Sequence, residues 1–152
     1  MSKSYYDSFF NATGDVFKLL LDLEVTRAGE HAADEELQNG VQIQIGVTGD
    51  LTGAITYRFP KQTTLEIVRI MSGMDFNELD AFVTSALGEV ANIISGNAMT
   101  MLSEQQLTCD ILPPRVALDE AKAGHTAHVV ESTLLQTAVG PLELEVALEP
   151  AV

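Results

Sequence analysis

The feature that most constrains the fold is a pair of alternating segments that flank a turn. Between residues 41 and 59, apolar side chains occupy every second position of two short stretches, and Gly49, Asp50 and Gly53 lie between them. Strict alternation puts apolar side chains on one face of a β-strand and the remaining ones on the other. Glycine and aspartate are the residues expected at a tight connection. The segment therefore predicts an antiparallel hairpin with one buried face.

Helical periodicity marks three other segments. Apolar residues recur at spacings of three and four over residues 5–23, 63–72 and 77–104. Gly73 is placed to end the second helix, and Asn77 is placed to cap the third, which would be about 40 Å long. Residues 108–112 and the alternating tail after Gly140 predict strands, whereas residues 27–40 predict a solvated loop. We expect one domain over residues 1–152, with an α+β fold in which an antiparallel sheet carries a long helix and two further helices.

The charge of the chain excludes several classes of partner. With 22 acidic and 8 basic residues the net charge is −14, so the surface lacks the cations that bind nucleic acid or an anionic membrane. No apolar run is long enough to span a bilayer, and the first residues lack the pattern of a secretory signal, so we expect a cytoplasmic protein. Cys109 has no second cysteine and no ligand set around it, so we interpret it as a strand residue.

The third predicted helix carries an unusual face opposite its apolar side. Helix surfaces in water are normally rich in Lys, Glu, Arg and Gln, yet small residues dominate here over several turns. Gly88 and Gly96 each cost a helix roughly 1 kcal/mol relative to alanine, which the close approach of another backbone would explain. The face is either a docking surface or a surface that packs on a second layer or a symmetric subunit. Centred on Asn92, it comprises Ala81, Ser85, Gly88, Glu89, Ser95, Gly96, Met99 and Ser103.

Glu89 and Asn92 are the chemically distinctive pair on this face. Residues three apart on a helix project side by side, with Cβ atoms roughly 5–6 Å apart, so both can address one group. No Lys or Arg occurs between Arg69 and Arg115, so Glu89 is available to the ammonium group of a partner. The amide of Asn92 takes up no proton near neutral pH, but it donates and accepts hydrogen bonds and can therefore orient a water.

Residues 87–98, with the sequence LGEVANIISGNA, resemble the signature of the CheC/CheX/FliY phosphatases of bacterial chemotaxis. The resemblance extends more loosely to the opening helix, the hairpin of residues 41–59 and the helix before the signature. One such signature is present, which is similar to CheX and unlike relatives with two sites. The same Glu-x-x-Asn spacing recurs at Glu36 and Asn39 in a polar segment without a helical frame, so the spacing alone carries little weight.

The resemblance implies a CheX-like fold and an enzyme that hydrolyses the aspartyl phosphate of a phosphorylated CheY-like response regulator. Glu89 would pair with a lysine of the receiver's active site, and Asn92 would orient the attacking water. The partner-binding surface would consist of the residues around this pair: Ser85, Gly88, Ser95, Gly96 and Met99. The resemblance further implies a homodimer built through the sheets, with no cofactor on this chain and Mg²⁺ held by the receiver. An aspartyl phosphate is an activated acyl phosphate, so positioning a water, worth about 7–11 kcal/mol in favourable cases, is the main task.

Two other functions stay open at this level. The chain could be a non-catalytic adaptor that binds a receiver or a motor component through the same face. It could also be a dimer whose symmetry axis buries the face around Asn92, which would leave no site there. Which receiver is the substrate, and which signalling pathway it serves, are questions about the partner.

The remaining polar candidates have structural interpretations. Asn97 falls on the apolar side of the helix, where we expect a buried amide bonded to the backbone. His125 and His128 lie where a strand would send them to opposite faces, which argues against a metal site. The acidic residues before the third helix suit its dipole and its cap: Asp75, Glu78 and Asp80.

Overall fold

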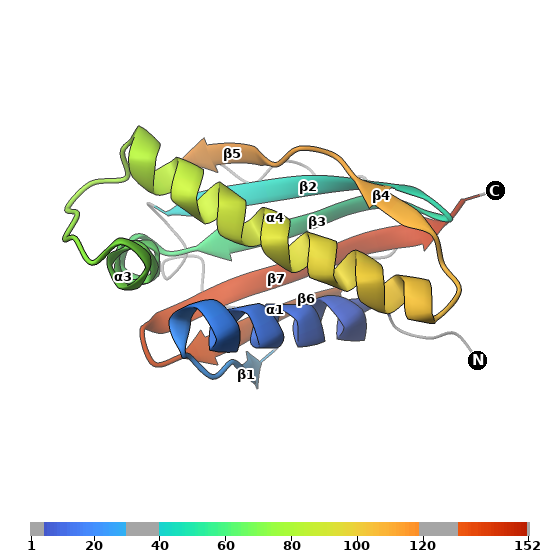
Figure 1. The fold of residues 1–152 in the computed structure, drawn as a ribbon, viewed down its shortest axis with the longest axis horizontal. Coiled ribbons are helices and arrows are strands. Elements are labelled where there is room, and N and C mark those ends of the chain that lie inside the picture. Colours follow the sequence, from blue (N-terminus) through green and yellow to red (C-terminus); the bar gives the residue numbers. More distant parts are fainter. Residues whose placement is uncertain (1–4, 30–39, 119–130, 152) are drawn as a thin grey trace.

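The computed structural model describes residues 5–29, 40–118 and 131–151 (Figure 1). The helices in these ranges are α1 (Tyr6–Leu21), α3 (Lys61–Ser72) and α4 (Ala81–Glu104). The strands are β1 (Thr26–Gly29), β2 (Val41–Gly49), β3 (Leu51–Phe59), β4 (Cys109–Ile111), β5 (Arg115–Leu118), β6 (Glu131–Thr137) and β7 (Gly140–Pro150).

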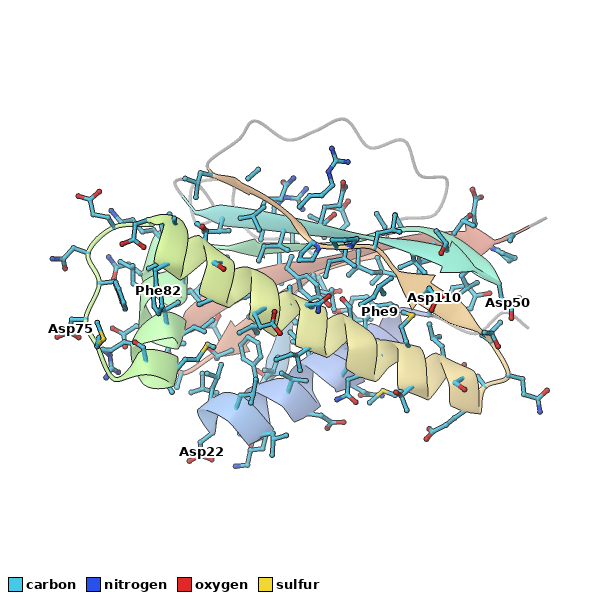
Figure 2. All side chains as sticks on the ribbon, turned by 45° about the horizontal axis from the view of Figure 1, so that its top comes forward. Phe9, Asp22, Asp50, Asp75, Phe82 and Asp110 are labelled. Atoms are coloured by element: carbon cyan, nitrogen blue, oxygen red, sulfur yellow. The ribbon has the colours of Figure 1, made fainter. Side chains whose placement is uncertain are left out.

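All described strands join one antiparallel sheet. Its order is β1-β6-β7-β3-β2-β4, and β5 pairs with the other end of the same edge of β2. The three described helices lie on one face of this sheet, and α4 crosses it as the longest of them (Figures 1 and 2). The expected α+β architecture, a sheet that carries a long helix and two further helices, is therefore confirmed.

The predicted hairpin is present as β2 and β3, with Ile45 opposite Ile55. In β2 every second residue from Val41 to Val47 is buried, as the alternation requires. Gly53 has φ 142°, and a Cβ there would collide with the carbonyl oxygen of Ala147 on β7. Only glycine allows β3 and β7 to approach so closely at this point.

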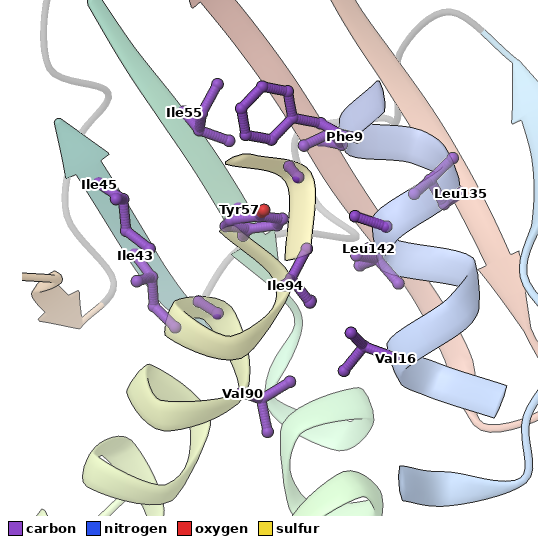
Figure 3. Packing of buried hydrophobic residues seen from close by; sticks show 14 of the residues in the cluster. Phe9, Val16, Ile43, Ile45, Ile55, Tyr57, Val90, Ile94, Leu135 and Leu142 are labelled. Carbon is purple, nitrogen blue, oxygen red and sulfur yellow. The ribbon is translucent and has the colours of Figure 1, made fainter. Parts of the chain in front are cut away.

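The core lies between the helices and the sheet. Figure 3 shows Val90 and Ile94 pointing from α4 into the core, toward Val16 of α1 and Tyr57 of β3. All four side chains are buried, and they belong to one continuous cluster. This contact fixes the distance of α4 from the sheet and its rotation about its own axis. It thereby fixes the direction of the side chains on its outer face.

Two short strands were not expected from the sequence. β1 lies in the stretch that we interpreted as a solvated loop, and it pairs with β6; β5 follows the two prolines after β4 and pairs with β2. With four residues each, neither strand is long enough for alternation to be visible. His125, His128 and the second Glu-x-x-Asn spacing lie outside the described residues.

The predicted N-cap of the long helix was wrong. Asp80 caps α4, and its Oδ1 accepts a hydrogen bond of 2.9 Å from the backbone N–H of Val83. Asn77 lies before this cap, outside the helix. The helix therefore has 24 residues, which gives about 36 Å rather than the 40 Å expected.

The expectation that one face of the hairpin is buried was too simple. On β3, Arg58 points to the sheet face away from the three described helices, yet it is only 8% exposed. Its Nη1 donates to Glu143 at 2.8 Å and to Glu145 at 2.9 Å, both on β7, and its Nε donates to Gln42 at 3.1 Å. A buried guanidinium needs such partners, and the neighbouring strands supply them.

Candidate functional site

The candidate site lies on α4. This helix packs on the rest of the described chain with one side only, which leaves its other side open. Its core side is fully buried at Val83, Leu87, Val90, Ala91, Ile94, Ala98 and Leu102. The opposite side faces away from the sheet and carries no further described layer (Figure 1). Side chains there are presented on a convex, well-supported helix surface.

Glu89 is exposed and Asn92 is half-buried, and the two lie three residues apart on this surface. Neighbours at this spacing face the same way, so the carboxylate and the amide can reach one group together. None of the ion pairs formed within the described ranges includes Glu89. The carboxylate is thus available for a cation that comes from another molecule.

The five residues expected to contact a partner fall into two groups. Ser85 and Gly96 are exposed, and a Cβ at Gly96 would have no atom within 4 Å. Met99 is half-buried and packs against the core. Gly88 and Ser95 are buried, so the expectation that these two are accessible to a partner is wrong.

The buried pair serves contacts within the chain. A Cβ at Gly88 would lie 3.4 Å from Cγ2 of Val116 on β5, an ordinary contact distance, so this position faces that edge strand. Ser95 is 0% exposed, and its Oγ lies 3.5 Å from the hydroxyl of Tyr57 on β3. The small residues on this side of α4 therefore serve close packing on the sheet, which is the alternative that the sequence left open for the whole face.

Buried hydroxyl groups lie between α4 and the sheet. Burial raises the pKa of the Tyr57 hydroxyl far above its usual range, and weaker effects of Ser95 and Thr13 lower it. Tyr57 therefore stays protonated and neutral, and it joins β3 to α4 and α1 directly behind the turn that carries Asn92. This linkage restrains the rotation of the helix.

The middle of the exposed side of α4 lies closer to Glu89 than to Asn92. The two residues are about 60° apart around the helix axis. This side includes two large apolar side chains, Phe82 and Ile93, to which the sequence pattern gave neither a core position nor a role in the site. Asn97, which we expected to be buried, is half-buried. Periodicity does not show which apolar residues of a helix remain uncovered, because that depends on the width of the sheet beneath.

Neither member of the Glu89 and Asn92 pair lines the hollow between α3 and residues 75–77. Among the described residues, no cluster of His, Cys, Asp or Glu side chains could hold a metal ion. No described helix is long and apolar enough to cross a bilayer. A carboxylate and an amide on a convex surface are suited to enter the active site of another protein, whereas a small molecule would need a concave site.

Comparison with known proteins agrees with this geometry. Residues 41–132 match the model of a family described as chemotaxis phosphatase CheX, and this range includes the whole of α4. A curated relative, the CheY-P phosphatase CheX of Thermotoga maritima, is 35% identical over 82 residues, which are 53% of each chain. The matched region thus spans about half the length of that relative.

Solved structures share the fold over nearly the whole chain. The chemotaxis protein CheX of Vibrio vulnificus aligns with a TM-score of 0.84 and 24% identity, over 95% of this chain and 99% of that one. The CheX–CheY–BeF₃–Mg²⁺ complex of Borrelia burgdorferi aligns with a TM-score of 0.75 and 22% identity, over 96% and 98%. These likenesses support the arrangement of sheet and helices described above.

Proposed function

This chain belongs to the chemotaxis phosphatase CheX family, and we propose that it hydrolyses the aspartyl phosphate of a CheY-like response regulator. The observation that carries the proposal is the exposed Glu89 beside the half-buried Asn92 on the convex face of α4, inside the region that matches the family. The reaction would take place in the regulator's active site, and this chain would supply one phosphatase domain that enters it.

Glu89 would recognise the regulator. Its carboxylate has no cationic partner within the described residues, so docking can join it to the lysine ammonium of the receiver's active site without breaking an internal ion pair. Close charge pairs at protein interfaces are worth about 1.5–7 kcal/mol in double-mutant cycles. Glu89 would therefore act mainly through affinity and orientation.

Asn92 would position the attacking water. Its side-chain amide can accept a hydrogen bond from the water and donate one to a phosphoryl oxygen. It removes no proton, and none has to be removed early, because phosphoryl transfer has a loose transition state that depends mostly on alignment. The half-buried position of Asn92 limits its rotamers, which favours one water orientation.

The regulator would bring the metal. A magnesium ion bound by the receiver's carboxylates would neutralise charge on the phosphoryl group, and this chain would bind no cofactor. The activity would be located in the cytoplasm, together with the regulator.

The decisive experiment is phosphate loss from a radiolabelled, phosphorylated CheY-like receiver of the same cell. It is measured alone, with this protein, and with the Asn92→Ala variant. We expect acceleration by the wild type and loss of most of that acceleration in the variant, although the variant still binds. Complex formation without any acceleration by the wild type would favour the adaptor function instead.

We further propose a homodimer that forms through the sheets and leaves α4 free. The sheet face without described helices and the short edge strands are available for such pairing, whereas the site on α4 must stay open. Light scattering should give twice the chain mass, and hydrogen exchange should show no protection of residues 85–96 on dimerisation. Protection of that segment would instead support a dimer that buries the candidate site.

A further inference from the structure

Two large apolar side chains remain exposed on the same face of α4 as Glu89. Phe82 is 54% exposed and Ile93 is 39% exposed. At about 100° per residue, both lie within about 40° of Glu89 around the helix axis, about 10 Å before it and about 6 Å after it. The carboxylate therefore stands between two apolar groups on one exposed ridge.

Phe82 has an aromatic packing partner although it is exposed. Its ring stacks on Phe76 with 5.2 Å between ring centroids and 22° between ring planes. Phe76 in turn packs against the small cluster of Leu65, Val68 and Val83 between α3 and α4. Figure 2 shows Phe82 at the start of α4, on the side of α3. A preoriented aromatic ring loses little entropy on binding, which is a property of interface hot spots.

A third apolar side chain borders the site from the sheet. Val116 on β5 lies directly opposite Ile43 of β2, so it points to the face of the sheet that carries the helices. It is half-exposed at 39% and lies next to Gly88, on the flank of α4 nearer to Asn92. Apolar groups thus adjoin the polar pair at both ends and along one side.

The size of a protein interface decides whether a receiver reaches Phe82. A standard interface covers about 800 Å² on each partner, which corresponds to a disc of about 16 Å radius. Phe82 lies about 15 Å along the axis from Asn92, inside such a disc. In the other direction, the exposed side chains after Ile93 are small or polar: Gly96, Thr100, Ser103 and Glu104. Apolar contact is available mainly toward the start of α4.

We propose that Phe82 is the main apolar anchor that holds the receiver domain on α4, with Ile93 and Val116 as flanking contacts. The proposal rests on the phosphatase function above, because that function places the receiver's phosphorylation site over Asn92. The occupant is the receiver surface beside that site. A chain with a net charge of −14 gains no long-range attraction to a carboxylate-lined metal site, so affinity has to come from short-range contacts, to which apolar burial adds beside the Glu89 pair.

The test compares Phe82→Ala and Ile93→Ala with a matched control, Leu112→Ala. Leu112 is 50% exposed, and its side chain covers Gly46 on the sheet face away from the described helices. Two quantities are measured for each protein: kcat and KM for phosphate release from the phosphorylated receiver, and Kd for the same receiver charged with beryllofluoride and Mg²⁺. Melting temperatures are recorded in parallel.

We expect Phe82→Ala to raise KM and Kd at least about tenfold and to change kcat by less than about twofold. Ile93→Ala should act in the same direction with a smaller effect, Leu112→Ala should match the wild type, and Phe82→Leu should restore part of the affinity. Unchanged Kd and KM in folded Phe82→Ala and Ile93→Ala proteins would overturn the proposal. If Phe82→Ala does not fold, Phe82→Leu and Ile93→Ala decide in its place.

The two proposals can fail separately. A wild-type protein that binds the charged receiver through Phe82 but releases no phosphate would remove the phosphatase function and keep the anchor. If the wild-type protein accelerates phosphate release and Phe82→Ala leaves KM unchanged, the phosphatase function stands and the anchor at Phe82 is removed.

Discussion

At Glu89 and Asn92, two side chains of one helix offer different chemistry to the same target. The carboxylate carries a charge and can attract a cation, while the amide is neutral and acts through the direction of its hydrogen bonds. Because Glu89 is exposed and Asn92 is half-buried, the first can adapt to a partner and the second is held more firmly. Substitutions at the two positions should therefore affect different kinetic constants.

Replacing Glu89 by glutamine should weaken docking. The variant keeps the shape of the side chain and removes the charge, so we expect KM for the phosphorylated receiver to rise at least about tenfold, in line with a charge pair worth 1.5 kcal/mol or more. The rise should shrink at high salt, since screening weakens the pair in the wild type as well. Steady-state phosphate release at two salt concentrations checks this.

Glu104→Gln is the matched control for that experiment. Glu104 is exposed on the same helix, about 22 Å further along the axis. Its loss should leave KM unchanged. An equal rise in KM for both variants would mean that general charge, not a specific pair at Glu89, governs binding.

At the scale of the element, α4 carries a glycine that its own packing does not require. A Cβ at Gly96 would meet no atom within 4 Å, in contrast to Gly88, where Val116 is close. Mid-helix glycine is less favourable than alanine by roughly 1 kcal/mol. Folding within the described residues does not explain the absence of a side chain at Gly96, whereas the proposed approach of a receiver would.

Gly96→Ala should stabilise the protein and impair docking. We expect a gain of roughly 1 kcal/mol in the free energy of unfolding, or about 2–4 °C in Tm, together with a higher KM for the receiver. Gly14→Ala in α1 is the matched control, because a Cβ there also meets nothing within 4 Å. It should give a similar gain in Tm with an unchanged KM. A Gly96→Ala protein with wild-type KM would contradict the docking role of this position.

The start of α4 depends on one side chain. Asp80→Ala removes the hydrogen bond to the N–H of Val83 and should lower the free energy of unfolding by about 1 kcal/mol. Asp75→Ala changes the same charge on an exposed residue that caps no helix and should have little effect. Thermal denaturation followed by circular dichroism separates the two; equal melting temperatures would argue against the cap.

At the scale of the whole molecule, the cluster around Arg58 joins four strands on the sheet face opposite the site. Its members come from β2, β3 and β7, and Ser132 of β6 donates a hydrogen bond of 2.8 Å to Glu143. Such a network favours the observed pairing of β3 with β7, in which Arg58 lies opposite Glu143 and also reaches Glu145.

Arg58→Ala should destabilise the fold strongly. The substitution leaves Glu143 and Glu145 buried without this cation, and breaking a buried ion pair typically costs about 3–5 kcal/mol. Arg69→Ala, which removes an exposed pair with Glu66 one turn away, should cost less than about 1 kcal/mol. Urea denaturation measures both. Similar midpoints for the two variants would show that the Arg58 cluster is not a stabilising element.

Sequence patterns alone determined the features that depend on near neighbours. The alternation in β2 and β3, the helical periods of α1, α3 and α4, and the glycine after α3 all reflect contacts within a few residues. The adjacency of Glu89 and Asn92 is of the same kind, since a helix places residues three apart side by side. These local rules hold whatever the helix packs against.

The tertiary structure alone decided how far α4 is turned about its axis. Small residues fit a docking surface and a helix–sheet contact equally well, so the sequence could not show that Gly88 and Ser95 face β5 and Tyr57 while Gly96 is open. The same holds for Phe82, which stays exposed because the packing beneath α4 covers only one side of the helix. Pairings between distant residues, such as Arg58 with Glu143, arise when strands meet and leave no periodic trace in the chain.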